Sequence, residues 1–184
     1  MRKEGWMELT TSLEGDAVEP LGDFDSFFHA NFERVAKTAA FVTRDVGTGQ
    51  DLAHEAFTRL LERWDEMASA DHARNFAFRV AINLARSHLR KHFRVVLYGL
   101  RRREDGGGAS TTDSSDDWFE VSQALGTLSS RQRACVVLVD YADMDAAGAA
   151  KVLGLSPATV RVHVMRGRRA LREGLGVDPR EDRG

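Results

Sequence analysis

Arginines and apolar side chains are interleaved in one segment near the carboxyl end of the chain, residues 155–172. Ser156 is a suitable helix N-cap and Pro157 suits the first helical position, so the sequence predicts a helix that begins there. Because apolar side chains contact thymine methyl groups and arginine binds guanine, we expect this helix to read bases in a DNA major groove. At about 100° per residue, it has an apolar face (Val160, Val164, Gly167 and Leu171) and an arginine-rich face (Arg161, Val162, Met165, Arg166, Arg169 and Arg172).

The residues before this helix fit the other half of a helix-turn-helix. A short helix is predicted over residues 146–153, and Gly154 is placed at the turn. In that motif, the second helix enters the groove and its first turns contact the bases. The competing interpretation is a three-helix domain with a basic surface that binds nothing.

A second helix, predicted over residues 74–93, carries a narrow polar stripe of Arg79, Asn83, Arg86 and Arg90. Their spacing places them within about 60° of the helix circumference, and apolar residues fill most of the remainder. Arginine binds phosphates and stacks on bases, and asparagine satisfies a base edge. The pattern favours a nucleic-acid surface over the alternative, a core helix with one solvated face, because ordinary solvated faces mix both signs of charge.

The net charge of −2 and the isoelectric point near 6.3 conceal a segregation of charge along the chain. Residues 74–103 hold nine Lys or Arg and residues 146–172 hold six, with no acid in either block. Residues 104–120 hold six acids and no base. Two separate acid-free basic blocks indicate a nucleic-acid-binding protein, although the chain as a whole is slightly acidic.

The remaining elements are also predicted to be helical. A first helix begins at the capping acid Asp23 and is expected to break at residues 47–49, Gly-Thr-Gly. A second covers residues 51–64, with Leu61 among its apolar residues, and a loop follows at 67–73. Further helices are predicted from Trp118 to Gly126 and from Ser129 to Tyr141.

No alternating strand pattern competes with these helices, so we expect an all-α protein without a sheet. Residues 106–117 are rich in Gly, Ser, Thr and Asp and cannot form a core, which predicts a flexible linker between two small helical domains. The expected divisions are a disordered arm (1–20), a first domain (21–96), a flexible acidic linker (97–117), a second domain (118–176) and a disordered tail (177–184).

Several other classes of protein find no support in the sequence. No apolar run approaches the roughly 20 residues of a membrane span, and acids interrupt the amino-terminal segment, so we expect no signal peptide and a cytoplasmic location. Met7 is an alternative start to Met1. The single cysteine, Cys135, is expected to be a small core residue. His88 and His92 lack the glutamate of a zinc-protease motif, so we expect no metal site, no cofactor and no enzymatic activity.

Four segments together resemble a known family. They are Asp51-Leu-Ala-His-Glu-Ala-Phe57, Ala77-Phe-Arg-Val-Ala-Ile-Asn-Leu-Ala-Arg-Ser-His-Leu-Arg90, Leu128-Ser-Ser-Arg-Gln-Arg133 and Thr159-Val-Arg-Val-His-Val-Met-Arg166. In this order, with an acidic linker between the second and third, the chain resembles the bacterial extracytoplasmic-function (ECF, group IV) sigma factors. The similarity covers roughly residues 23–175.

The resemblance implies that the first domain is sigma region 2. Asp51, His54 and Glu55 would then dock on the clamp coiled coil of the polymerase β′ subunit, with His54 where the family usually has Gln. The loop over residues 68–74 would capture a flipped base, which costs a few kcal/mol to extrude. The stripe that would engage and help open the −10 element consists of Arg79, Asn83, Arg86 and Arg90.

The resemblance implies that the second domain is sigma region 4, which reads the −35 element and contacts the polymerase β flap. Gly148 stands near the position of the family's usual Glu, a change that weakens a helix by roughly 1 kcal/mol relative to Ala. An anti-sigma factor is a further expected partner. The base readers would be Arg161, Val162, Met165 and Arg166, and the phosphate contacts would be Thr159, Arg168 and Arg169.

Two alternatives to an initiation subunit remain open at this point. A LuxR-type helix-turn-helix regulator would need a sensor domain, and the first 90 residues show neither a ligand pocket nor a phospho-acceptor. The other is a protein-interaction module that has lost DNA binding. Dependence of DNA binding on core RNA polymerase separates the regulator from the sigma factor, and substitution of Arg161 and Arg166 tests the interaction module.

Overall fold

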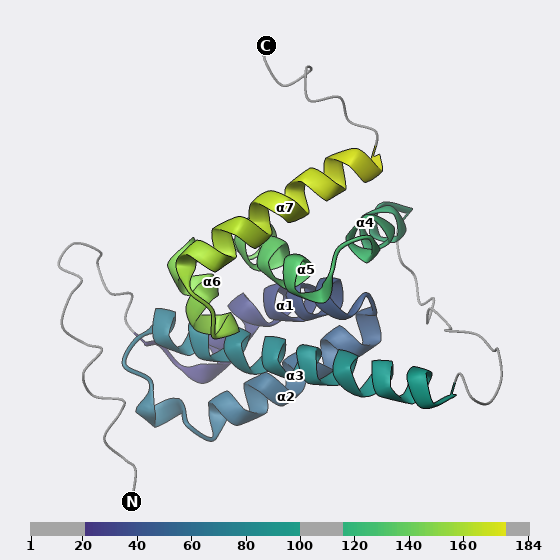
Figure 1. The fold of residues 1–184 in the computed structure, drawn as a ribbon. Coiled ribbons are helices and arrows are strands. Elements are labelled where there is room, and N and C mark those ends of the chain that lie inside the picture. Colours follow the sequence, from purple (N-terminus) through teal and green to yellow (C-terminus); the bar gives the residue numbers. More distant parts are fainter. Residues whose placement is uncertain (1–20, 100–115, 176–184) are drawn as a thin grey trace, which may run out of the picture.

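The computed structural model describes residues 21–99 and 116–175, and every long element in them is a helix (Figure 1). No strand occurs within these two ranges, as expected. The expected arm, most of the linker and the tail lie outside the described residues. The helices are α1 (Phe24–Thr43), α2 (Val46–Leu61), α3 (Ala70–Gly99), α4 (Asp116–Gly126), α5 (Ser130–Val136), α6 (Ala146–Leu153) and α7 (Pro157–Leu175), with a 3-10 turn at Trp64–Glu66 and a π-helix at Val137–Tyr141.

The junction between α1 and α2 differs from the sequence prediction. α1 begins at the Asp23 cap as expected, but it ends at Thr43, where Arg44 adopts the left-handed conformation with φ 64°. The side chain of Asp45 then caps α2 by accepting a hydrogen bond of 2.6 Å from the Thr48 amide. Gly47 and Gly49 therefore lie inside the helix, and the predicted break at residues 47–49 is wrong because the cap sets the start.

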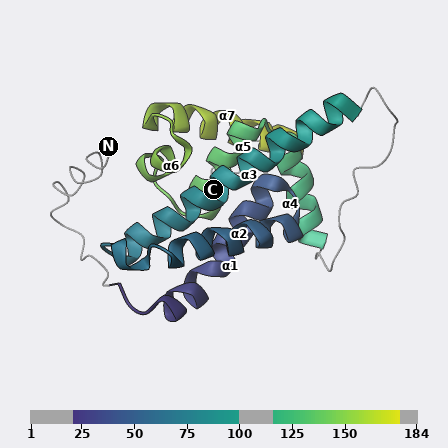
Figure 2. The same cartoon turned by 90° about the horizontal axis from the view of Figure 1, so that it is seen from below.

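Aromatic rings from α1, α2 and the 3-10 turn form one cluster in the first domain, around the buried Phe57. Phe28 and Phe57 lie 5.1 Å apart edge to face, and Phe24 and Trp64 lie 5.2 Å apart. α3 covers both helices (Figure 2). Leu61, which the sequence pattern placed on the apolar side, is 53% exposed because α2 ends there and the chain turns away.

α3 starts earlier and ends later than predicted. Ser69 Oγ accepts a hydrogen bond of 3.1 Å from the His72 amide, so the helix begins at Ala70 instead of Arg74. It continues to Gly99, and the predicted loop over 67–73 shortens to a few residues. Most of the segment expected to capture a flipped base is therefore the first turn of a helix.

The second domain follows the predicted order. Ser129 and Gln132 form a capping box at the start of α5, which runs into the π-helix that ends at Tyr141. Gly154 ends α6 with φ 65°, a conformation that glycine adopts without strain. The apolar face of α7 packs onto α5 so closely that a Cβ on Gly167 would lie 2.6 Å from Val136 Cγ2.

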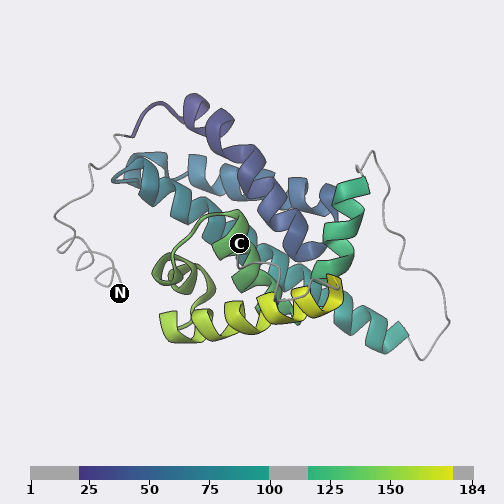
Figure 3. The same ribbon diagram turned by 90° about the horizontal axis from the view of Figure 1, so that it is seen from above.

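The two domains are packed against each other in the structure. α5 and α6 lie over α1 and α3, and α7 crosses above them (Figures 1 and 3). None of the described helices combines the length and the apolar character needed to cross a membrane.

Gly49 allows α2 to approach α1, because a Cβ there would lie 2.5 Å from the Ala40 backbone nitrogen. We expect Gly49→Ala to lower the free energy of unfolding by about 1–3 kcal/mol through overpacking. Gly47→Ala is the matched control, since its nearest atom would be 3.7 Å away, and it is expected to cause no loss. Urea denaturation of both variants measures the difference. Equal stabilities would contradict the role given to this contact.

Burial raises the pKa of the Cys135 thiol from 9.0 to about 11, with a small opposing effect of Arg86. At pH 9, about one thiol in a hundred is then ionised in the folded protein, against about half in the unfolded chain. We expect iodoacetamide to modify folded Cys135 at least about tenfold more slowly than a Ser130→Cys, Cys135→Ser variant, whose thiol is exposed. Mass spectrometry follows the modification, and equal rates in the two proteins would contradict this expectation.

The raised pKa of Cys135 also predicts a dependence of stability on pH. The free energy of unfolding should fall as the pH rises from about 9 to 11, because the thiol of the unfolded chain loses its proton at a lower pH than the thiol of the folded protein.

Candidate nucleic-acid interface

The amino-terminal end of α7 is fixed by its cap. Ser156 Oγ accepts a hydrogen bond of 3.1 Å from the Thr159 amide, and the two hydroxyl oxygens lie 2.8 Å apart. Thr159 is half-buried in this arrangement. The cap and the Gly154 turn orient α7 across α6 in the manner of a helix-turn-helix.

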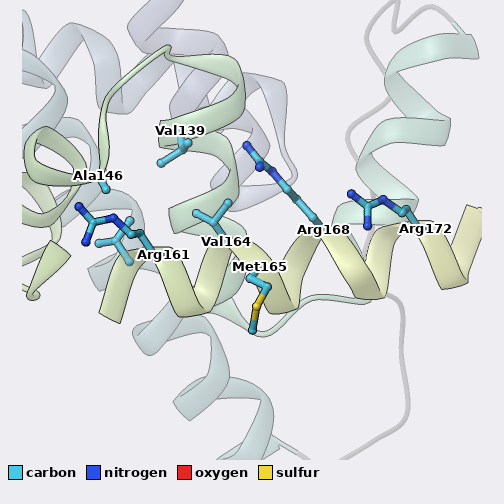
Figure 4. A pocket seen from close by; sticks show the side chains of 8 residues that line it. Val139, Ala146, Arg161, Val164, Met165, Arg168 and Arg172 are labelled. Atoms are coloured by element: carbon cyan, nitrogen blue, oxygen red, sulfur yellow. The ribbon is translucent and has the colours of Figure 1, made fainter. Parts of the chain in front are cut away.

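One face of α7 is buried in the domain and the other is open. Val160 and Val164 are buried, as the helical periodicity predicted. On the open face, Val162 is 40% exposed and Met165 63% exposed, and both arginines that flank them, Arg161 and Arg166, are exposed. In Figure 4, the Met165 side chain points away from the domain, next to a shallow cavity of about 350 Å³ bordered by Arg161, Arg168 and Arg172.

Two further arginines of α7 have acidic partners. Arg168 pairs with both carboxylate oxygens of Asp140, and this hydrogen bonding raises the pKa of its guanidinium. Arg169 donates to Glu173 at 2.8 Å. Both pairs are on the surface, where such interactions contribute only about 0–1 kcal/mol, so each arginine can exchange its partner for a phosphate.

Gly148 lies in the first turn of α6. Its amide donates a hydrogen bond of 2.7 Å to the Asp145 side chain, which caps the helix. The helix thus begins with a strong N-cap, although its third residue has a low helix propensity.

The stripe on α3 is partly covered by the second domain. Asn83 and Arg90 are exposed, whereas Arg79 and Arg86 are half-buried. Arg86 donates a hydrogen bond of 3.0 Å to the Leu153 carbonyl at the end of α6. Burial and, next, repulsion from nearby arginines lower the pKa of Arg86. The sequence pattern predicted the stripe as an open surface, and half of it is therefore not open in this arrangement.

The acidic face of α2 is open. Asp51, His54 and Glu55 are exposed on the side of α2 away from the domain core. His54 Nδ1 lies 3.0 Å from the Gln50 carbonyl oxygen, and its ring is 4.5 Å from the Phe32 ring. Glu55 accepts a hydrogen bond of 2.8 Å from Arg59. The contacts with the Gln50 carbonyl and the Phe32 ring thus hold the imidazole in place on the surface.

Sequence reasoning missed two arginines that join the domains. Arg133 is buried on α5 and donates to three carbonyls, one of them on α1. Arg44 donates to the Ser122 carbonyl on α4 at 3.0 Å. The available signal for Arg133 was its place just before the apolar run of residues 134–139, where a charged side chain needs a partner.

Comparisons with known proteins agree with this geometry. The family model for sigma-70 region 2 matches residues 27–95, and the model for sigma-70 region 4 matches residues 118–171. Two curated relatives are 27% identical over 168 residues, which is 89% of this chain and 90% of theirs. They are the probable RNA polymerase sigma-C factor of Mycobacterium bovis and the ECF RNA polymerase sigma factor SigC of Mycobacterium tuberculosis.

Two solved structures share the fold. The sigma factor RpoE of Bartonella quintana, in complex with the anti-sigma factor NepR, has a TM-score of 0.71 and 23% identity over 85% of this chain and 98% of that one. CnrH, in complex with the cytosolic domain of CnrY, has a TM-score of 0.61 and 22% identity over 84% and 88%.

The comparisons bear on one of the two alternatives that the sequence left open. A LuxR-type regulator is not supported, because the amino-terminal half matches a sigma region and not a sensor domain. The α1–α3 bundle with its polar stripe and the helix-turn-helix of α6 and α7 correspond to the two matched regions in their usual order. The chain therefore belongs to the sigma-70 family and is an RNA polymerase sigma factor of the extracytoplasmic-function group.

Proposed function

We propose that this sigma factor reads its promoter at two points, with α7 on the −35 element and the α3 stripe on the −10 element. The observation that carries this proposal is that two arginine-rich surfaces lie on separate domains, each on a stretch of sequence that contains no acid. Run-off transcription with core RNA polymerase and a randomised promoter library tests it, because two conserved blocks at a fixed separation should be selected.

On α7, the proposed base readers are the exposed residues of its first turns, Arg161, Val162, Met165 and Arg166. The two arginines suit guanine and the two apolar side chains suit thymine methyl groups. Thr159, Arg168 and Arg169 are proposed to hold phosphates, which position the helix without specifying sequence. For Arg168 and Arg169, DNA binding would replace Asp140 and Glu173 with phosphate.

On α3, the proposed −10 surface consists of Arg79, Asn83, Arg86 and Arg90. A strand of the melted duplex needs cations for its backbone and a polar side chain for a base edge, and this stripe supplies both. Since Arg86 is bonded to Leu153, the proposed contact requires the second domain to move away from α3.

The proposed polymerase contacts lie on the faces that remain. Asp51, His54 and Glu55 would bind the β′ clamp, and region 4 would bind the β flap. An anti-sigma factor is a further proposed partner, since the structural neighbour RpoE of Bartonella quintana was solved in complex with one. We propose a cytoplasmic, non-enzymatic role, as promoter recognition requires.

We expect Arg161→Ala and Arg166→Ala each to weaken binding of the holoenzyme to a library-selected promoter by about 1–3 kcal/mol and to relax base preference at one −35 position. Arg172→Ala removes the same charge further along α7 and is the control, with a smaller effect and unchanged base preference. Electrophoretic mobility shift with the holoenzyme measures the affinity. Unchanged base preference in both reader variants would show that α7 does not read these bases.

The double variant Asp51→Asn, Glu55→Gln should weaken binding to core polymerase by about tenfold, equivalent to about 1.4 kcal/mol, because it removes two charges from the proposed clamp surface. Glu33→Gln removes an exposed acid from α1, outside this surface, and should leave the affinity unchanged. Fluorescence anisotropy of labelled sigma factor with core polymerase gives both values. Equal affinity of all three proteins would exclude this face of α2.

A further inference from the structure

Five arginines from different elements line one cleft of about 870 Å³. The cleft lies between the end of α1, the middle of α3 and the connection from α4 to α5. Among the described residues, no acid lines it. A space of this size accommodates a small organic ligand. The arginines that line it are Arg44, Arg86, Arg90, Arg131 and Arg133.

The positive charge of this cleft has no counter-charge in the described part of the chain. None of its five guanidinium groups pairs with a carboxylate of residues 21–99 or 116–175. The other described arginines outside the α3 stripe and α7 behave differently, because each has an acidic partner. They are Arg34, Arg59, Arg63 and Arg74.

The arginines of the cleft are close enough to repel one another. Burial lowers the pKa of Arg86, and repulsion from Arg90 and Arg131 lowers it further. Burial likewise lowers the pKa of Arg133, with a second contribution from Arg44. Like charges in this arrangement are unfavourable, and an anion placed among them would turn the repulsion into attraction.

Three of the five guanidinium groups are held in place by main-chain carbonyls. Arg44 donates a hydrogen bond of 3.0 Å to the Ser122 carbonyl, and Arg133 donates to three carbonyls. Arg86 donates a bond of 3.0 Å to the Leu153 carbonyl. A guanidinium has more N–H donors than one such bond uses, so Arg44 and Arg86 keep most of theirs for a ligand. Donors that are fixed before binding lose less entropy when the ligand arrives.

We propose that this space, which we term the arginine cleft, binds a small polyphosphate, a chain of linked phosphates that is free or carried by a nucleoside. The planar fork of arginine binds phosphate oxygens in pairs, and linked phosphates bring several negative charges into one small volume. A single carboxylate would satisfy only part of the cluster. Leu89 adds an apolar wall that suits a sugar or a base.

A nucleic-acid strand is the alternative occupant of the arginine cleft. A strand favours cations that follow a line, as on the α3 stripe, whereas these arginines surround one volume. Arg86 and Arg90 also belong to the proposed −10 surface, so a bound polyphosphate would compete with the −10 strand for them. That consequence alone rests on the proposed function, and the binding itself does not.

Isothermal titration calorimetry of the full chain with sodium tripolyphosphate tests the proposal. We expect one site per chain, with binding at least about tenfold tighter than that of orthophosphate at about 150 mM NaCl, because several arginines act on one ligand. Tripolyphosphate that binds no more tightly than orthophosphate would contradict the proposal.

Arg131→Ala is the decisive variant, because Arg131 is exposed and makes no hydrogen bond or ion pair with any described residue. It should weaken tripolyphosphate binding at least about fivefold. Arg131→Lys should weaken it less, since lysine keeps the charge but not the planar fork. Arg172→Ala is the matched control, which removes the same charge from an exposed position on α7 and should leave the affinity unchanged. Equal losses in Arg131→Ala and Arg172→Ala would show that the anion binds basic surfaces in general and would overturn the proposal.

Titrations with two further ligands identify the occupant. ATP that binds more tightly than tripolyphosphate would assign the apolar wall at Leu89 to a nucleoside, and equal or weaker binding would show that the phosphate chain alone is recognised. Both results support the proposal. An oligonucleotide of deoxythymidines is the third ligand. If Arg131→Ala weakened its binding and left tripolyphosphate binding unchanged, the cleft would belong to the nucleic-acid surface and the proposal would be wrong. Arg131 is outside the residues proposed to contact DNA, so a failure of the promoter assignment would not alter these titrations.

Discussion

The arrangement of the two domains depends on the need of one buried guanidinium for acceptors. Arg133 projects from α5 into a region where burial lowers the pKa of its guanidinium, and three main-chain carbonyls surround it. Two of these belong to its own domain and one to α1, so the same side chain that orders the α4–α5 connection also joins the halves of the chain. Removal of α1 would leave one nitrogen donor of the Arg133 guanidinium without a protein partner, and protein interiors avoid such unpaired donors.

The three proposed functional surfaces differ in how strongly the fold constrains them. The open face of α7 follows from a cap, a glycine turn and an apolar stripe within one short stretch of chain. The acidic face of α2 follows from the aromatic cluster that fixes the opposite face. The α3 stripe alone depends on where another domain lies, because Arg86 meets the end of α6.

Local signals in the sequence were sufficient for most helices, and long-range contacts account for the errors. Ser156 and Pro157 mark the start of α7 within two residues, and Asp23 does the same for α1. Gly49 was interpreted as a helix break because its role is not visible in the sequence. The role is to let α2 approach Ala40 of α1 closely, which is a contact between two helices. The bond from Arg133 to Val42 joins residues 91 positions apart, and no periodicity in either segment predicts it. The proposed site residues on α7 and α2 lie on exposed helix faces, which the helical periodicity of the sequence predicts. The covering of Arg86 depends on how the two domains pack, and periodicity does not predict that packing.

The acceptors used at the domain interface have a consequence for its kinetics. Val42 lies in the last turn of α1 and Leu153 is the final residue of α6, where carbonyl groups have no partner within their own helix. When the domains separate, water can bond to these carbonyls at once, and no helix has to unwind. Separation of the domains then requires no local unfolding of α1 or α6, and it belongs with the rigid-body movements that proteins complete in microseconds to milliseconds.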